Sequence, residues 1–142
     1  MDLSSYRIEV WHAVGTLWKG FGADPEAVIT KMFPQASAFV DEMFDRKQTP
    51  ESASLQIVTN VLGGYIQHGM PVEQKRAVLL ELHKVTNMSF EEAQGYPALP
   101  FVAHVVAAWQ VAQRWAAEGK VDAPTQLLDG VIGSLAAGLE RP

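Results

Sequence analysis

Residues 101–118 read FVAHVVAAWQVAQRWAAE, and this stretch decides the fold class. Drawn as an α-helix, it is apolar over most of its circumference, with Gln110, Gln113 and Arg114 on a narrow polar strip. A helix that is apolar on nearly every side is normally surrounded by other helices. We therefore expect a helical bundle with the Phe101–Glu118 helix at its centre.

Further amphipathic segments lie on both sides of this helix, and prolines, glycines and capping residues mark where they start and stop. The expected helices comprise residues 5–19, a short helix after Asp24-Pro25, residues 34–46, 50–68 and 71–87, a capped turn from Ser89, and residues 101–118 and 124–139. No segment alternates apolar and polar residues over more than a few positions, so no sheet is expected. The sequence predicts an all-α, compact, single-domain bundle of seven or eight helices over residues 1–142.

The composition and charge exclude several functions. The 142 residues are 48% apolar and 19% charged, values typical of a globular domain. The net charge of −5 is spread without a basic cluster for a phosphate backbone, so no nucleic-acid partner is expected. No stretch offers the ~20 apolar residues of a membrane span, and no signal peptide is evident. The absence of cysteine suits a reducing compartment, so we expect a soluble, cytoplasmic protein.

The four histidines do not form a metal-binding or catalytic motif. Metal-binding pairs on a helix are three or four residues apart, whereas the two nearest histidines, His68 and His83, are fifteen apart. The motifs of serine hydrolases and of phosphate-binding loops are also absent from the sequence. We therefore expect no metal and no catalytic residue, and a non-enzymatic role is favoured.

The last expected helix carries a face of small residues, Gly130, Gly133, Ser134 and Ala137, beside a bulky apolar face. Small residues let another helix approach closely. That helix belongs either to the same chain or to a second copy related by a two-fold axis. The sequence has no catalytic motif but has several apolar helical faces. Our leading hypothesis is therefore a non-enzymatic binding or regulatory protein that acts through an apolar helical surface. Its partner would be another protein or itself, with a homodimer as the expected assembly.

A second hypothesis rests on His83, which lies at the edge of the apolar stripe of its helix. The segment Leu79–Lys84 resembles the globin helix that carries the proximal histidine. Lys31-Met32-Phe33 followed by Phe44 resembles the second helix and the haem-contacting phenylalanine of bacterial globins, and Gly119–Ala123 resembles the turn into the last globin helix. This resemblance implies haem as a cofactor, with His83 as the proximal ligand and Phe44 packed on the porphyrin. Under the other hypotheses no cofactor is expected.

A third hypothesis is a small-molecule pocket, with or without catalysis, near His104, Trp109, Trp115 and Tyr65. Positions 104, 108, 111 and 115 are spaced four, three and four, which puts His104 and Trp115 on one face of their helix. The alternative for His104 is a core histidine that is hydrogen-bonded to a backbone carbonyl.

Overall fold

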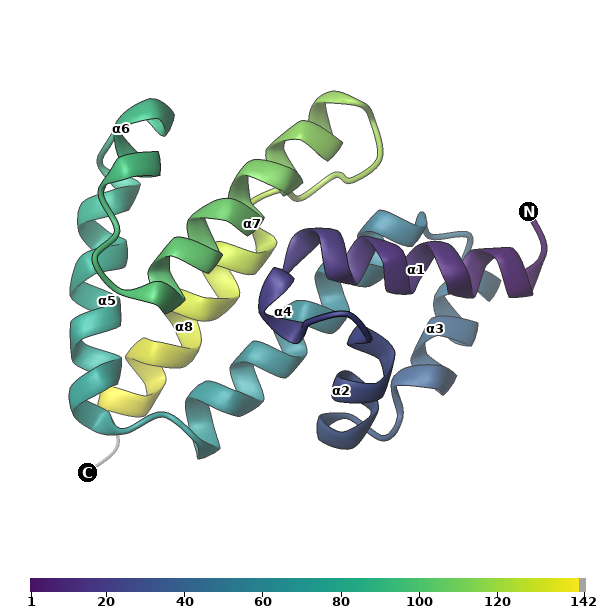
Figure 1. Ribbon diagram of the computed structural model, residues 1–142, viewed down its shortest axis with the longest axis horizontal. Coiled ribbons are helices and arrows are strands. Elements are labelled where there is room, and N and C mark those ends of the chain that lie inside the picture. The colour runs from purple at the N-terminus through teal and green to yellow at the C-terminus, as the bar shows by residue number, and fades with distance from the viewer. Residues whose placement is uncertain (141–142) are drawn as a thin grey trace.

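The computed structural model describes residues 1–140, apart from the side chains of residues 90 and 140, and it confirms the all-α fold class. Within these residues the chain forms eight α-helices and one 3-10 turn, with no strand. The elements, labelled in Figure 1, are α1 (Leu3–Leu17), η1 (Lys19–Phe21), α2 (Pro25–Met32), α3 (Ala36–Asp45), α4 (Pro50–His68), α5 (Val72–Thr86), α6 (Phe90–Gly95), α7 (Pro100–Ala117) and α8 (Gln126–Glu140).

Three helices begin at the capping residues that the sequence predicts. The side chains of Asp24 and Thr49 each accept a hydrogen bond from the amide three residues ahead, at 3.2 and 3.0 Å. Ser89 and Glu92 form a reciprocal capping box at the start of α6. Each of these bonds satisfies an amide that the helix itself leaves unpaired, so the helix starts are fixed locally.

Helix α1 begins and ends earlier than predicted. It starts at Leu3 instead of Ser5 because the carboxylate of Asp2 accepts a hydrogen bond from the Ser5 amide at 2.8 Å. The same hydrogen bond lowers the pKa of the Asp2 carboxyl. The helix ends at Leu17, and the residues that follow form the separate turn η1. Asp2 therefore acts as a cap that sets the register of the N-terminus.

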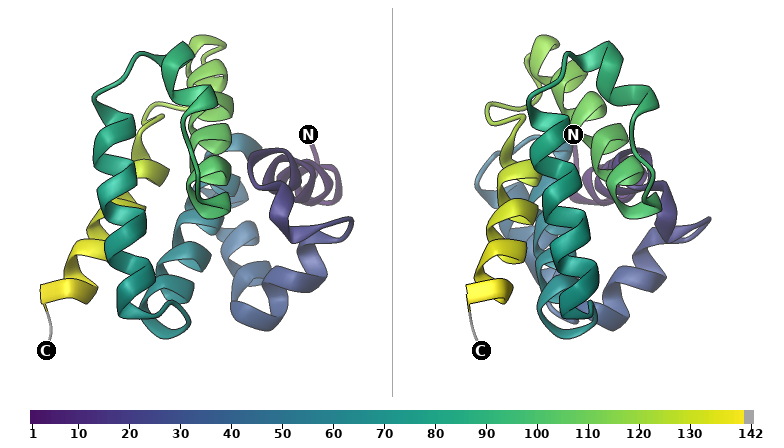
Figure 2. Two further views of the ribbon diagram at one scale, coloured as in Figure 1. Left: turned by 60° about the vertical axis from the view of Figure 1, so that its left-hand side comes forward. Right: turned by 90° about the vertical axis from the view of Figure 1, so that its left-hand side faces the viewer.

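Helix α4 lies at the centre of the bundle, and the prediction that the Phe101–Glu118 helix is central was wrong. Helices α1 and α8 both pack along α4, and α5 packs on α8. Helix α7 contacts α1, α5, α6 and α8 and forms an outer part of the bundle. Figures 1 and 2 show α5 and α6 at one end of the molecule and α2 and α3 at the other.

The kind of apolar residue explains this difference. Helix α4 buries eight side chains, most of them large: Ala53, Ser54, Leu55, Ile57, Val58, Val61, Leu62 and Ile66. Many apolar residues of α7 are alanines, and Ala103 and Ala107 are exposed. A methyl group presents little apolar area, so leaving it in water costs little free energy. Buried area, and not the number of apolar positions, decides which helix is central.

Small residues let α4 and α8 approach each other closely. A Cβ atom added at Gly130 of α8 would lie 2.6 Å from Cγ2 of Thr59 in α4, which is too close for two non-bonded carbon atoms. A Cβ atom added at Gly63 would lie 3.4 Å from Oγ of Ser134. The Thr59 hydroxyl donates to the carbonyl of Leu55 at 2.7 Å, which holds the threonine in one rotamer. Part of the predicted small-residue face of α8 therefore packs inside the chain.

A buried lysine joins α5 to α8. The Lys75 residue is only 7% exposed, and a Cβ atom added at Gly138 would lie 2.8 Å from its Nζ. Gly138 therefore leaves the space that the lysine side chain occupies. The ammonium group lies near the last turn of α8, where the helix dipole favours a positive charge.

An ion pair and an aromatic contact hold α3 against α1. Arg7 donates to both carboxylate oxygens of Asp41, at 2.7 and 2.9 Å. The ring centroids of Tyr6 and Phe44 are 5.3 Å apart. The Tyr6 hydroxyl is buried, and no described residue forms a hydrogen bond with it. Burial raises the pKa of Tyr6, and the carboxylate of Glu51 raises it further.

We expect Gly130→Ala to destabilise the protein and Gly133→Ala to stabilise it. Both positions lie inside α8, where alanine is intrinsically preferred to glycine. At Gly133 an added Cβ atom meets nothing within 4 Å, so we expect a gain of about 0.5–1 kcal/mol. At Gly130 the methyl group must displace Thr59, so we expect a loss of about 1–3 kcal/mol. Urea denaturation measures both, and equal gains would contradict the close contact of α4 and α8.

We expect Tyr6→Phe to raise the free energy of unfolding by about 1 kcal/mol, because it removes a buried hydroxyl without a described partner. Tyr96→Phe is the matched control, since Tyr96 is partly exposed and its substitution should change stability little. Thermal unfolding followed by circular dichroism compares the three proteins. A clear loss of stability in Tyr6→Phe would show that the hydroxyl has a stabilising partner.

Candidate functional site

The two residues that the globin resemblance singles out do not share a pocket. His83 is exposed on α5, whereas Phe44 packs against Tyr6 between α1 and α3. Figure 1 shows α5 and α3 on opposite sides of the molecule. Neither residue lines any of the three surface hollows identified among residues 1–140. The geometry does not bring together the two sides of a haem site.

The aromatic region predicted to form a small-molecule pocket is occupied by packed rings. The ring of His104 lies 5.2 Å from that of Trp18, and Trp18 contacts Phe101 at 5.6 Å. Tyr65 stacks on the other side of this group, with its ring 6.3 Å from that of Phe101. Trp18 is the ring at the middle of this cluster, and the pocket hypothesis did not include it.

The two tryptophans of α7 belong to the core. Trp115 is buried, and Trp109 is partly buried against the same cluster of apolar side chains. Together with His104 they line none of the three hollows identified in the described part of the chain. Of the four residues named for this hypothesis, only Tyr65 borders one of these hollows.

The four small residues of the last helix lie in different environments. Gly130 and Ser134 face α4, as described above. Gly133 is exposed with open space at its Cβ position, and Ala137 is partly buried. Packing within the chain accounts for Gly130 and Ser134, while self-association at Gly133 stays a prediction.

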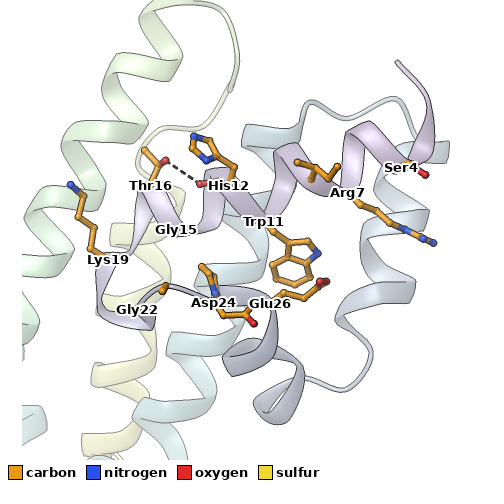
Figure 3. Close-up of a pocket in the computed structure, with 13 residues that line it drawn as sticks. Ser4, Arg7, Trp11, His12, Gly15, Thr16, Lys19, Gly22, Asp24 and Glu26 are labelled. Carbon is orange, nitrogen blue, oxygen red and sulfur yellow. Dashed lines mark hydrogen bonds between the residues drawn. The ribbon is translucent and has the colours of Figure 1, made fainter.

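The larger hollow is a groove of about 920 Å³ between α1 and the start of α2. Figure 3 shows its lining residues along α1 and around the start of α2. Its lining consists of Ser4, Arg7, Ile8, Trp11, His12, Gly15, Thr16, Lys19, Gly22, Ala23, Asp24, Pro25 and Glu26.

Several polar groups of this groove already have partners within the chain. Arg7 pairs with Asp41 on α3, and Asp24 caps α2. The Thr16 hydroxyl donates to the carbonyl one turn earlier at 3.0 Å, which Figure 3 marks with a dashed line. Structural roles therefore account for these three side chains, and we interpret the groove as the boundary between the packed helices α1 and α2.

A second hollow has a different character. It is a groove of about 450 Å³ between the end of α2 and the second half of α4, and we call it the α2–α4 groove. Its lining consists of Met32, Phe33, Asn60, Val61, Gly64, Tyr65, His68 and Gly69. None of these lining residues is Asp, Glu, Lys or Arg. An uncharged lining with Met, Phe and Tyr is typical of the centre of a protein–protein interface.

Gly64 opens the hollow on the side of α4. An added Cβ atom at Gly64 meets nothing within 4 Å, in contrast to Gly63, whose Cβ position contacts Ser134. A glycine inside a helix costs about 0.5–1 kcal/mol relative to alanine. A methyl group at Gly63 would contact Ser134 of α8 at an ordinary van der Waals distance, whereas no contact within the described chain involves the Cβ position of Gly64. The structure shows an open space beside Gly64 on the surface of α4.

Two exposed side chains stand at the rim of the α2–α4 groove. Met32 is 53% exposed at the end of α2, and Tyr65 is 39% exposed on α4. Stacking on Phe101 orients the Tyr65 ring, and a Cβ atom added at Gly69 would lie 3.1 Å from that ring. Phe101 therefore orients the tyrosine ring and Gly69 leaves room for it, whereas Met32 ends an unbranched chain with three rotatable bonds. The rim therefore has one side chain of fixed orientation, Tyr65, and one that can change its rotamer, Met32.

Two polar side chains complete the lining. Asn60 and His68 are exposed, and neither makes a side-chain hydrogen bond to the described residues. Their donors and acceptors are available to groups that enter the groove from outside. A few polar groups beside an apolar surface give a binding site its orientation and specificity.

Comparison with known protein families, curated proteins and solved structures finds no significant match to this chain. Within residues 1–140, no helix has the length and apolar character needed to cross a membrane. No group of three or more His, Asp or Glu side chains in the same residues gathers in a way that could hold a metal ion. The candidate site therefore rests on the geometry of the α2–α4 groove alone.

One sequence signal points to this groove. Gly63 and Gly64 stand side by side in the middle of a long helix, although each glycine costs ~1 kcal/mol there. Such a pair indicates either that another segment packs closely against the helix or that an open space lies beside it. The sequence does not say which neighbour lies on which side. Met32, on the opposite wall, enters the sequence argument only through its place in the globin resemblance.

We expect Gly64→Ala to raise the free energy of unfolding by about 0.5–1 kcal/mol. The reason is that the added methyl group meets open space and lowers the backbone entropy of the unfolded chain. The gain should match that of Gly133→Ala, which has the same surroundings in α8. Parallel urea denaturation of both variants checks this. A loss of stability in Gly64→Ala would show that Gly64 is needed for packing within the chain.

Proposed function

We propose that this protein is a non-enzymatic, cytoplasmic binding protein that holds an apolar side chain of a protein partner in the α2–α4 groove. This is the apolar helical surface that the leading hypothesis requires. Self-association belongs to the proposal, with a homodimer as the expected assembly. The observation that carries the proposal is the uncompensated Gly64, which keeps the groove open at a cost to the stability of α4.

The chemistry of the lining favours binding over catalysis. General acid–base catalysis uses groups whose pKa lies near the operating pH, usually in pairs. His68 is the one histidine in the lining, and its side chain makes no hydrogen bond to the described residues that would orient it. Apart from the Asn60 amide and the Tyr65 hydroxyl, the remaining lining is apolar or glycine. Such a surface recognises shape and apolar area.

The composition supports the cytoplasmic part of the proposal. The chain has no cysteine, so its stability does not depend on disulfides and is insensitive to a reducing compartment. This supports the cytoplasm as the place where the protein acts. Localising a tagged full-length chain by microscopy checks this part of the proposal.

The test of the binding site is an NMR titration with tert-butanol, which mimics a branched aliphatic side chain. In a sample that light scattering reports as monomeric, we expect saturable shifts at the Met32 methyl group and the Gly64 amide. Gly64→Leu should abolish these shifts because the new side chain fills the groove. Shifts that occur only in the α1–α2 groove, or no saturable shifts at all, would contradict the proposal.

The matched control is Gly133→Leu. Gly133 is also an exposed glycine inside a helix, with open space at its Cβ position, but it does not line the α2–α4 groove. We expect this variant to fold and to keep the full tert-butanol response. The pair therefore separates the effect of filling the groove from the general effect of leucine on a helix surface.

A further inference from the structure

We infer that the partner whose side chain enters the α2–α4 groove is a second copy of this chain; this inference rests on the proposed function. The groove carries both a projecting apolar side chain, Met32, and the space left by Gly64. A surface with both features is complementary to itself. Across a two-fold axis, Met32 of each copy would enter the space above Gly64 of the other copy.

Helix α2 has an apolar strip that its own chain does not cover. Of its eight residues, only Ile29 is buried. Val28 and Met32 are one turn apart on the same side of the helix, and they are 37% and 53% exposed. The strip continues the rim of the groove, so one partner surface would cover both. Contiguous exposed apolar side chains of this kind mark interaction surfaces.

The absence of charge in the lining favours a copy over a partner of opposite charge. In a two-fold contact, a charged residue near the axis faces its own equivalent, and like charges repel. The groove has no Asp, Glu, Lys or Arg in its lining, although the whole chain carries a net charge of −5. A basic partner would be attracted by acidic residues in the lining, which this groove lacks. A neutral lining instead removes the repulsion that two copies would otherwise meet.

The first experiment measures the assembly of the full chain by sedimentation equilibrium, from micromolar to submillimolar concentrations. We expect a reversible monomer–dimer equilibrium. Gly64→Leu fills the space and Met32→Ala removes the projecting side chain, so each variant should weaken the dimer by about tenfold or more. Gly133→Leu should leave the dimer unchanged.

The second experiment mixes the two weakened variants in equal amounts. In the mixed dimer, Met32 of one chain meets the open Gly64 of the other. At the second contact, the leucine introduced at position 64 meets the alanine introduced at position 32. Both contacts regain one large and one small residue, so we expect the dissociation constant to return to within about threefold of wild type. Native mass spectrometry identifies the mixed dimer by its mass.

Circular dichroism shows whether each variant is folded, and Met32→Ala keeps the test independent of any folding defect of the leucine variant. A chain that stays monomeric at every concentration, while tert-butanol still binds the groove, overturns the inference together with the expected homodimer and leaves the groove as the site for a foreign partner. A dimer that only Gly133→Leu disrupts places the contact on α8 and also overturns the inference. Failure of the tert-butanol titration in a monomeric sample contradicts the proposed function itself.

Discussion

Helix α8 lies close to α4 because side chains are missing where the two helices meet. Gly130 leaves room for the methyl group of Thr59, and Gly63 leaves room for Ser134. Helix α8 packs along one side of α4 and α1 along another. The large aliphatic residues of α4 therefore fill the core, and the remaining helices pack around this centre. A methyl group at Gly130 would force Thr59 or the two helices to shift, whereas one at Gly63 would make an ordinary van der Waals contact with Ser134.

Two adjacent glycines of α4 have opposite consequences. Gly63 faces Ser134 of α8. Gly64 faces outward and lines the α2–α4 groove. The same helix is thus the centre of the fold and one wall of the candidate site. A groove built on the most buried helix is held rigidly, which lowers the entropic cost of binding a partner. Its other wall, the end of α2, is short and carries the flexible Met32.

Much of the fold follows from the sequence because local signals are strong. Caps such as Asp24 and Ser89 act within one turn, so they can be recognised without knowledge of the rest of the chain. The identity of the central helix was predicted incorrectly because a helical wheel counts alanines such as Ala103 equally with larger residues. The α2–α4 groove could not be predicted, since the same glycine pattern is compatible with packing or with open space. Only the position of α8 separates Gly63 from Gly64.

Helix α4, and not α7, is the central helix of the fold. Native-state hydrogen exchange of the backbone amides tests this claim directly, because amides of the most cooperative part of a protein exchange only by global unfolding. We predict that the backbone amides between Ala53 and Ile66 exchange slowest, at the rate set by global unfolding. The amides of α7 should exchange faster, through smaller openings of the structure. Slowest exchange in α7, with α4 opening independently, would contradict the account.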